Sequence, residues 1–255
     1  MFRVVIPARH GSSRLPGKPL LLLAGKPLLQ WVHERATQSA AAEILVATDD
    51  DRIADTARGF GARVVMTALT HQSGTDRIAE VAERAGWAPE DIVVNLQGDE
   101  PMMPAVLVDQ VAGLLEAHPG DAIGTLASKI ATLNAFLDPN IVKVITDAQG
   151  RALYFSRAPI PWGRDSAPAG MASQRGFAGA RRHIGLYAYR VEALRRMSMS
   201  PPSLLEQIEK LEQLRALEAG LSIRVAEARV TPGPDVNTPE DLVRVERLIL
   251  QGEES

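Results

Sequence analysis

Short runs of β-branched residues alternate with helix-patterned segments through the first half of the chain, and this alternation constrains the fold most. The runs that predict strands are residues 3–6, 44–48, 63–67 and 92–96. Between the first two runs, apolar residues recur at helical spacing, at Leu28, Leu29, Trp31, Val32 and Ala36. Strands separated by helices form a parallel sheet with helices packed on it. Ligands of such sheets bind beyond the carboxyl ends of the strands.

Capping signals mark the starts and ends of further helices. Ser73 and Asp76 have the spacing of a capping box, so a helix is expected to start there and to run to Ala85. Thr238 and Asp241 repeat this spacing at the start of the last helix. Two more helices are expected over residues 51–58 and 204–219.

The second half of the chain departs from this alternation. Strand-like runs follow one another with few helices between them, over residues 123–130, 142–146, 152–156, 183–189 and 223–225. Part of the sheet is therefore expected to be antiparallel, or a β-arm projects from it. Residues 159–182 are rich in Gly, Pro, Ala and Arg, which suits either a solvated loop or a mobile basic flap over an anionic substrate.

Composition excludes several classes of protein. The chain has 255 residues, of which 45% are hydrophobic, so it can bury a substantial core. Its net charge of −3 provides no basic field for nucleic acid. It has no cysteine, and its histidines lack metal-ligand spacing, so any metal is expected to be a hard cation held by oxygen atoms. Without a signal peptide or a membrane-spanning apolar run, the chain is expected in the cytoplasm.

The opening stretch MFRVVIPARHGSSRLPGKPL combines a strand with a basic loop. Residues 4–6 predict a buried strand that Pro7 is expected to end. The loop then interleaves glycines and serines with positive charges at Arg9, Arg14 and Lys18. Such a loop at the ligand edge of a sheet is expected to cradle phosphates, and an ordinary basic turn is the alternative. Its prolines exclude the loop of P-loop ATPases.

Two further motifs could supply oxygen ligands for a metal. In VVNLQGDEPMMP, residues 93–104, a hydrophobic strand ends in acids, of which Asp99 could hold Mg²⁺ against phosphate oxygens. In PGPDVNTPEDL, residues 232–242, either Asp235 or Asn237 could be a second ligand, or both simply lead into the capped helix.

Several motifs occur in one order along the chain and together carry a resemblance. They are Arg9-x-x-Ser12-x-Arg14-Leu15-Pro16-Gly17-Lys18-Pro19-Leu20, His71-Gln72-Ser73-Gly74-Thr75, Gln97-Gly98-Asp99-Glu100-Pro101, Tyr154-Phe155-Ser156-Arg157, Arg182-His183-Ile184-Gly185-Leu186-Tyr187 and Leu211-Glu212-Gln213-Leu214-Arg215. Over nearly the whole chain, this ordered set resembles the family of 3-deoxy-manno-octulosonate cytidylyltransferases, or CMP-KDO synthetases.

The resemblance implies a nucleotide-diphospho-sugar-transferase-like (Rossmann-like) α/β fold, in which helices flank a mixed, mostly parallel sheet. It implies one domain over residues 1–255, with residues 1–120 mainly binding nucleotide and residues 121–230 mainly binding sugar and forming a homodimer. The implied reaction joins CTP and the acidic sugar KDO into CMP-KDO and pyrophosphate, with Mg²⁺, for lipopolysaccharide synthesis. Neither nucleic acid nor membrane insertion is implied.

The resemblance also assigns roles to individual residues. The implied catalytic residues are Arg9, Lys18 and Asp99. The implied nucleotide-binding residues are Arg9, Ser12, Arg14, Lys18, Ser73, Arg77 and Gln97. The implied sugar-binding residues are Gln97, Arg157, His183, Tyr187, Glu212 and Gln213. The implied metal ligands are Asp99 with Asn237 or Asp235.

One motif departs from the family pattern. The family usually reads Gly-Val-Asp before the last helix, whereas this chain reads Asp235-Val236-Asn237. If this segment is extended, Asp235 and Asn237 lie on one face and could share a metal. His183 could be a general base, a sugar contact or a structural residue. Alternative functions are a CMP-sialate-type or 8-amino-KDO cytidylyltransferase and a non-catalytic nucleotide-binding module.

Overall fold

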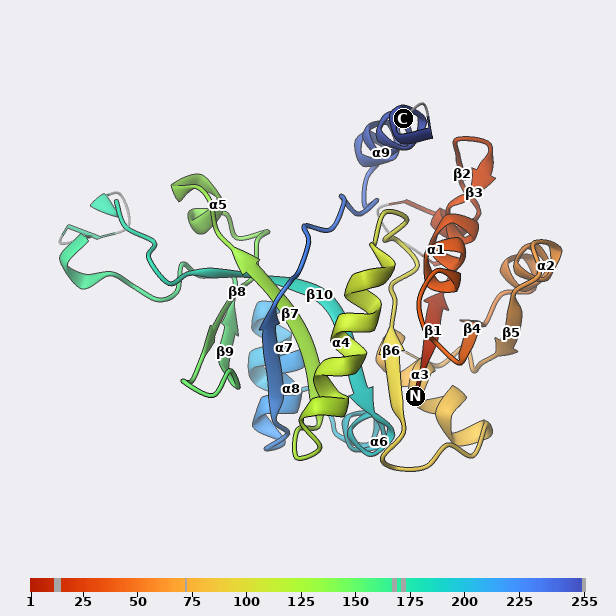
Figure 1. The fold of residues 1–255 in the computed structure, drawn as a ribbon, viewed down its shortest axis with the longest axis horizontal. Helices are drawn as coiled ribbons and strands as arrows, with labels where there is room; N and C mark the ends of the chain where they lie inside the picture. Colours follow the sequence, from red (N-terminus) through yellow and green to blue (C-terminus); the bar gives the residue numbers. More distant parts are fainter. Residues whose placement is uncertain (12–14, 72, 167–168, 171–172, 254–255) are drawn as a thin grey trace.

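The computed structural model describes residues 1–11, 15–71, 73–166, 169–170 and 173–253. Its centre is a mixed sheet with the strand order β11-β7-β10-β6-β1-β4-β5 (Figure 1). The strands are β1 Phe2–Ala8, β4 Glu43–Thr48, β5 Arg63–Met66, β6 Ile92–Asn95, β7 Ile123–Lys129, β10 Arg181–Arg190 and β11 Ile223–Glu227. Only β10 in this series runs against its neighbours, β6 and β7. The expected mixed, mostly parallel sheet is confirmed.

Helices cover both faces of the sheet, because alternate residues of each strand point to opposite sides. The first face carries α1 Leu28–Thr37, α2 Asp51–Gly59, α4 Ala105–Ala117 and α9 Pro239–Glu253. The second face carries α3 Gly74–Arg84, α6 Val191–Met199 and α8 Gln213–Glu218. Within β1, Val4 and Ile6 belong to the first core and Val5 to the second. No helix in the described ranges is long and apolar enough to cross a membrane.

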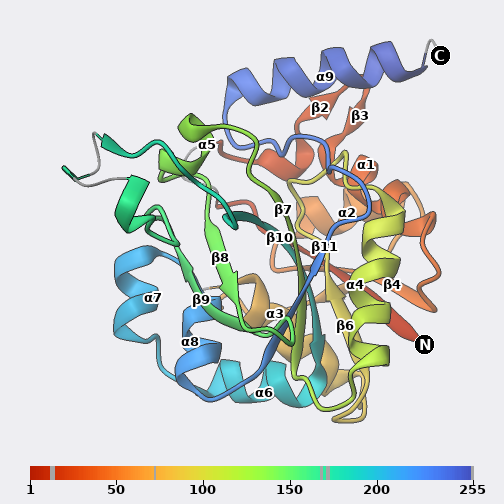
Figure 2. The same cartoon turned by 60° about the vertical axis from the view of Figure 1, so that its left-hand side comes forward.

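A two-stranded arm extends the main sheet from β10. Strand β8, Lys143–Thr146, pairs antiparallel with both β10 and β9, Ala152–Ser156. Figure 2 shows this arm beside α7, Leu204–Glu209, and α8. The expectation of antiparallel pairing in the second half is confirmed. The remaining short elements are η1 Lys18–Leu20, β2 Leu22–Leu23, β3 Lys26–Pro27, α5 Leu133–Leu137 and η2 Arg164–Ser166.

Two helix starts agree with the capping signals. Ser73 is the N-cap of α3 and forms a reciprocal capping box with Asp76. At α9, the backbone N–H of Asp241 donates to Thr238 Oγ1, while Thr238 N–H donates to Asp241 Oδ2. Both caps satisfy N–H groups that a helix start leaves without partners.

The first strand does not end at Pro7, as the sequence suggested. β1 runs to Ala8, and Pro7 pairs with Ala47 of β4. The pairing of β1 with β6 stops earlier, at Val5 and Asn95. Pro7 therefore lies where only one neighbouring strand pairs with β1, and its missing N–H interrupts no ladder with β6.

The single helix expected over residues 204–219 is wrong, because the chain forms α7 and α8 with a break at Lys210. Lys210 adopts a left-handed backbone conformation with φ 55°. The Glu209 carboxylate before it accepts hydrogen bonds from Ser156 Oγ at 2.6 Å and from Arg157 N–H at 2.9 Å. These contacts with the end of β9 fix the last residue of α7. Leu211 is buried after the break, whereas Ile208 is exposed before it.

Candidate active site

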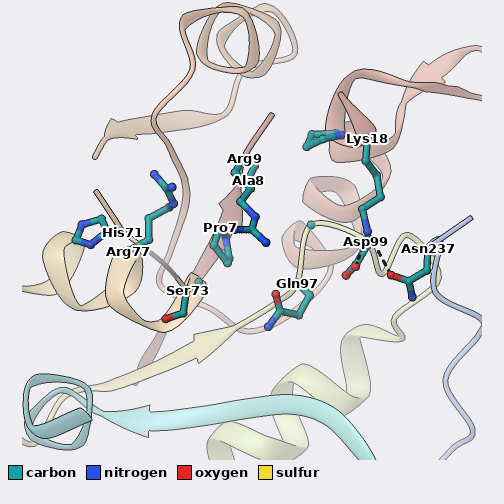
Figure 3. A pocket seen from close by; sticks show the side chains of 13 residues that line it. Pro7, Ala8, Arg9, Lys18, His71, Ser73, Arg77, Gln97, Asp99 and Asn237 are labelled. Carbon is teal, nitrogen blue, oxygen red and sulfur yellow. Dashed lines mark hydrogen bonds and ion pairs between the residues drawn. The ribbon is translucent and has the colours of Figure 1, made fainter. Parts of the chain in front are cut away.

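The basic loop after β1 is closed by a backbone hydrogen bond. Gly17 N–H donates to His10 O at 3.1 Å, and Gly17 has a left-handed φ of 66° that favours glycine. This turn starts η1 at Lys18, whose side chain points toward the loop after β6 (Figure 3). Ser12 and Arg14, both predicted to bind nucleotide, lie outside the described residues.

A cavity of about 260 Å³ lies at the carboxyl ends of β1 and β6. Its lining residues are Pro7, Ala8, Arg9, Lys18, Pro19, His71, Ser73, Gly74, Arg77, Gln97, Gly98, Asp99 and Asn237. In Figure 3, Lys18 and Asp99 lie on one side of this cavity, Arg77 lies on the opposite side, and Gln97 lies between them. The fold thus brings together predicted residues from four separate segments of the chain: Arg9 with Lys18, Ser73 with Arg77, Gln97 with Asp99, and Asn237.

Three oxygen atoms surround the Lys18 ammonium. Lys18 Nζ donates to Asp99 Oδ2 at 2.7 Å, to Val236 O at 3.0 Å and to Asn237 Oδ1 at 3.5 Å. Gly98 allows this arrangement, because a Cβ at Gly98 would lie 3.0 Å from Pro7 O. A carboxylate, a carbonyl and an amide oxygen therefore converge on one positive charge.

The opposite side of the cavity is held by two fixed side chains. The Arg77 side chain is only 3% exposed, and it donates to Asp49 Oδ2 at 2.8 Å and to Thr67 Oγ1. His71 Nε2 lies 2.5 Å from Glu80 Oε2. These contacts orient a guanidinium and an imidazole beside the N-terminus of α3 before any ligand binds.

A second cavity, of about 310 Å³, adjoins the first. Its lining residues are Thr75, Asn95, Gln97, Asp99, Glu100, His183, Gly185, Tyr187, Tyr189, Leu211, Glu212, Gln213 and Asp235. It shares Gln97 and Asp99 with the first cavity. The predicted sugar-binding residues Gln97, His183, Tyr187, Glu212 and Gln213 all line it.

Buried polar atoms without hydrogen-bond partners gather in the second cavity. They are Asn95 Oδ1, Glu100 Oε2, Tyr187 Oη and Gln213 Nε2. Leaving a buried polar group unpaired costs about 1–3 kcal/mol, so such atoms in one cavity indicate a polar ligand. Asn95 and Tyr187 lie directly opposite each other on β6 and β10. No sequence motif predicts a role for Asn95 or Glu100, although Asn95 interrupts the apolar run 92–96.

His183 is half-buried at the edge of the second cavity, and its ring is neutral at pH 7. Burial, with a smaller contribution from Arg182, lowers the pKa of His183 to about 3. Its Nε2 lies 3.1 Å from Thr125 Oγ1, and its ring packs edge-on against Phe155. A group with this pKa accepts protons poorly at neutral pH, so the geometry favours a sugar contact over a general base.

Glu212 connects the two cavities. Burial raises the pKa of Glu212, and hydrogen bonding to Ser73, the charge of Arg215 and hydrogen bonding to Thr75 counteract this rise. Arg215 Nη2 also donates to Glu212 Oε1 at 2.9 Å. Because Ser73 lines the first cavity and Glu212 the second, their contact spans the wall between them.

Arg157 is the predicted sugar-binding residue that the fold does not bring to this cavity. Its Nε donates to Glu209 O at 2.6 Å and its Nη1 to Pro139 O at 3.0 Å. It lines neither of the two cavities. Its contact with a sugar carboxylate stays a prediction. For that contact to form, the guanidinium would have to break its hydrogen bonds with the carbonyls of Glu209 and Pro139.

The oxygen atoms around Lys18 also suit a hard cation. In the described part of the chain, no group of three or more His, Cys, Asp or Glu side chains could hold a metal ion. The donors here are instead the Asp99 carboxylate, Val236 O and Asn237 Oδ1, the mixed oxygen set that Mg²⁺ accepts. Burial, with smaller contributions from the charges of Asp99 and Asp235, raises the pKa of Glu100 to about 8.

The fold and the two adjoining cavities indicate the class of protein to which this chain belongs. A mostly parallel sheet places a basic loop and a carboxylate at one edge, as nucleotide-binding transferases require. The family model described as "Cytidylyltransferase" matches residues 3–223, so the class is that of the cytidylyltransferases. The chain is therefore an enzyme of the nucleotidyltransferase type.

Comparison with individual relatives shows which cytidylyltransferases are similar to this chain. A 3-deoxy-manno-octulosonate cytidylyltransferase of Thioalkalivibrio sulfidiphilus is 54% identical over 97% of this chain and 98% of the relative. One of Pseudomonas syringae is 53% identical with the same coverage. A solved structure, a CMP:2-keto-3-deoxy-manno-octonic acid synthetase complexed with CTP, is 43% identical with a TM-score of 0.87, and 98% of each chain is covered. The chain belongs to the 3-deoxy-manno-octulosonate cytidylyltransferase family.

Proposed function

We propose that this enzyme transfers CMP from CTP to the anomeric hydroxyl of KDO and releases pyrophosphate. The adjoining cavities carry this proposal, because Gln97 and Asp99 line both of them. A nucleotide in the first cavity and a sugar in the second would meet at these two residues. Holding both reactants at one boundary supplies the proximity that a transfer reaction needs.

The positive side chains of the first cavity can offset the negative charge of the two substrates. CTP and a sugar acid are both anions, so positive charge must offset their repulsion and the charge on the leaving pyrophosphate. Lys18 supplies that charge at the end of the cavity next to Asp99, and Arg9 supplies it between Lys18 and Arg77 (Figure 3). Arg77 and Ser73, at the other end, would then face the nucleoside.

The reaction also fits a divalent cation. Asp99 and Asn237 would hold Mg²⁺, with Asp235 beside them, and the ion would neutralise phosphate charge and lower the pKa of the attacking hydroxyl. The chain's own part is to direct these oxygen atoms toward the shared wall of the two cavities. With a cation bound, Lys18 would be free to turn from Asp99 toward a phosphate.

The second cavity suits a polyhydroxylated ligand. Sugar hydroxyls can both donate and accept hydrogen bonds, so they would satisfy the unpaired atoms of Asn95, Tyr187 and Gln213. Glu212 would accept hydrogen bonds from hydroxyls, and His183 would contact the sugar as a neutral ring. The relatives support KDO rather than a sialate or an 8-amino analogue as the sugar, and an enzyme rather than a non-catalytic binding module.

The wider setting is also part of the proposal. We place the enzyme in the cytoplasm, in lipopolysaccharide synthesis, with residues 1–120 mainly binding nucleotide and residues 121–230 mainly binding sugar. A homodimer would form through residues 123–190. The exposed apolar side chains of Leu153 in β9 and of Trp162 in the segment that follows β9 support this surface. A monomer in light scattering at micromolar concentration would contradict the dimer.

Pyrophosphate release tests the function. The enzyme would be incubated with CTP, Mg²⁺ and either KDO, its 8-amino analogue, a sialic acid or no sugar. Release that depends on KDO and exceeds release with the other acids is expected. If CTP binds but no sugar triggers release, the chain is a binding module instead.

A further inference from the structure

The segment before α9 turns two polar side chains to one side. Val236 N–H donates to Asp99 O at 2.9 Å, and the Val236 side chain is fully buried. Its neighbours Asp235 and Asn237 hydrogen-bond to each other through their side chains. The backbone of this segment is thus tied to the loop that carries Asp99, while the flanking side chains meet next to the Lys18 ammonium.

The Asn237 amide is oriented by two partners of opposite kind. Lys18 Nζ can only donate, and it lies 3.5 Å from Asn237 Oδ1. The Asp235 carboxylate accepts, and Asn237 Nδ2 donates to its Oδ2 at 2.5 Å. If the Asn237 amide were reversed, its NH₂ group would face the Lys18 ammonium and its oxygen would face the Asp235 carboxylate. Two donors and two acceptors would then oppose each other. Asp235 therefore keeps the oxygen of Asn237 pointed at the place where the positive charge lies.

We infer that Asp235 is a positioning residue that acts on the cation site through Asn237 and does not ligate the cation itself. This inference rests on the proposed function, because it concerns the cation of that reaction. Among the described residues, Lys18 Nζ makes hydrogen bonds with Asp99, Val236 and Asn237 but not with Asp235, which lines the second cavity. An amide carries no charge, so its value as a ligand depends on correct orientation.

Mn²⁺ binding measured by electron paramagnetic resonance, with CTP present and no sugar, tests this role without turnover. Losing an outer-shell partner typically weakens metal affinity about 10–100-fold, so Asp235→Ala should raise the Kd of Mn²⁺ by at least about tenfold. Asp235→Asn should stay close to wild type, because its amide oxygen can still accept from Asn237 Nδ2. Asp55→Ala is the matched control, since Asp55 is 76% exposed and pairs with Arg58 on the surface of α2.

A double-mutant cycle separates orientation from charge. In the Asn237→Asp background no amide remains to be oriented, so adding Asp235→Ala should not raise the Kd. If wild type binds Mn²⁺ and Asp235→Ala leaves the Kd unchanged, the inference is overturned while the proposed function stands. If Asp235→Ala and Asp235→Asn raise the Kd equally, Asp235 acts through its charge and the positioning role is wrong. A wild-type enzyme that binds no Mn²⁺ contradicts the proposed cation site and this inference together.

Discussion

Lys18 Nζ lies 2.7 Å from Asp99 Oδ2, and this ion pair joins the loop after β1 to the loop after β6. The two side chains are 14% and 28% exposed, so the pair is partly shielded from water. Each strand of a parallel pair delivers its loop to the same edge, which is why residues so distant in sequence meet here. Asp99 lines both cavities, so the pair stands at the boundary between them.

Replacing Lys18 should slow the reaction severely. Lys18→Met removes a charge that would stabilise the departing pyrophosphate, and such contacts are worth about 2–4 kcal/mol, or roughly 10²–10³ in kcat. Lys26→Met is a matched control, because Gly25-Lys26-Pro27-Leu28 repeats the local sequence, but Lys26 pairs with Glu34 and lies over Trp31. Steady-state kinetics should show the loss in the first variant alone. If Lys18→Met and Lys26→Met lowered kcat equally, Lys18 would have no specific role in the reaction.

Replacing Asp99 should abolish turnover and leave the fold intact. Asp99→Ala removes the carboxylate that both cavities share and leaves the Lys18 ammonium with only uncharged oxygen partners. Pyrophosphate release should fall to background, whereas the circular dichroism spectrum and melting temperature should stay near those of Asp55→Ala. Near-normal turnover of Asp99→Ala at excess Mg²⁺ would contradict the role of Asp99 as a catalytic residue that holds the metal.

Replacing Asn95 should weaken sugar binding selectively. Asn95→Ala removes an unpaired buried acceptor that a sugar hydroxyl would use, and one hydrogen bond is worth about 0.5–1.5 kcal/mol. The KM for KDO should rise about two- to tenfold, while the Kd for CTP stays unchanged. Asn134→Ala, at an exposed position of α5, is the control. If only the affinity for CTP changed, Asn95 would contact the nucleotide and not the sugar.

His183 should make stability depend on pH under acidic conditions. Its pKa is about 3 in the folded chain, against an ordinary value of 6.5, so between these values the unfolded chain binds more protons. The free energy of unfolding therefore falls as pH drops from 6.5 toward 3, by up to about 1.4 kcal/mol per pH unit. Urea denaturation from pH 7 to pH 4 should show a shallower fall for His183→Asn than for wild type. Parallel curves would mean that His183 titrates normally.

Much of the fold and of the first cavity could be predicted because the signals are local. The capping box at Ser73 and the strand ending before Gln97 depend on neighbouring residues, and the parallel topology then brings those strand ends together. The relation between Asp235 and Asn237 was likewise foreseeable, since alternation along an extended segment puts both on one face.

The rest depends on contacts between distant segments. The helical periodicity of 204–219 continues through Lys210, and the break there accompanies contacts of Glu209 with Ser156 and Arg157. The role of Asn95 depends on β10 inserting antiparallel beside β6, which puts Tyr187 opposite it. The first contact has no signal in the local sequence, and the only local signal of the second is a polar residue, Asn95, in an otherwise apolar strand.

A crystal structure of the enzyme with CTP and Mg²⁺ bound would show where the nucleotide lies. We expect the triphosphate between Arg9 and Lys18, with the α-phosphate at the wall formed by Gln97 and Asp99 and the base toward Arg77. A nucleotide bound in any other cavity, with its phosphates away from Lys18 and Asp99, would contradict this expectation.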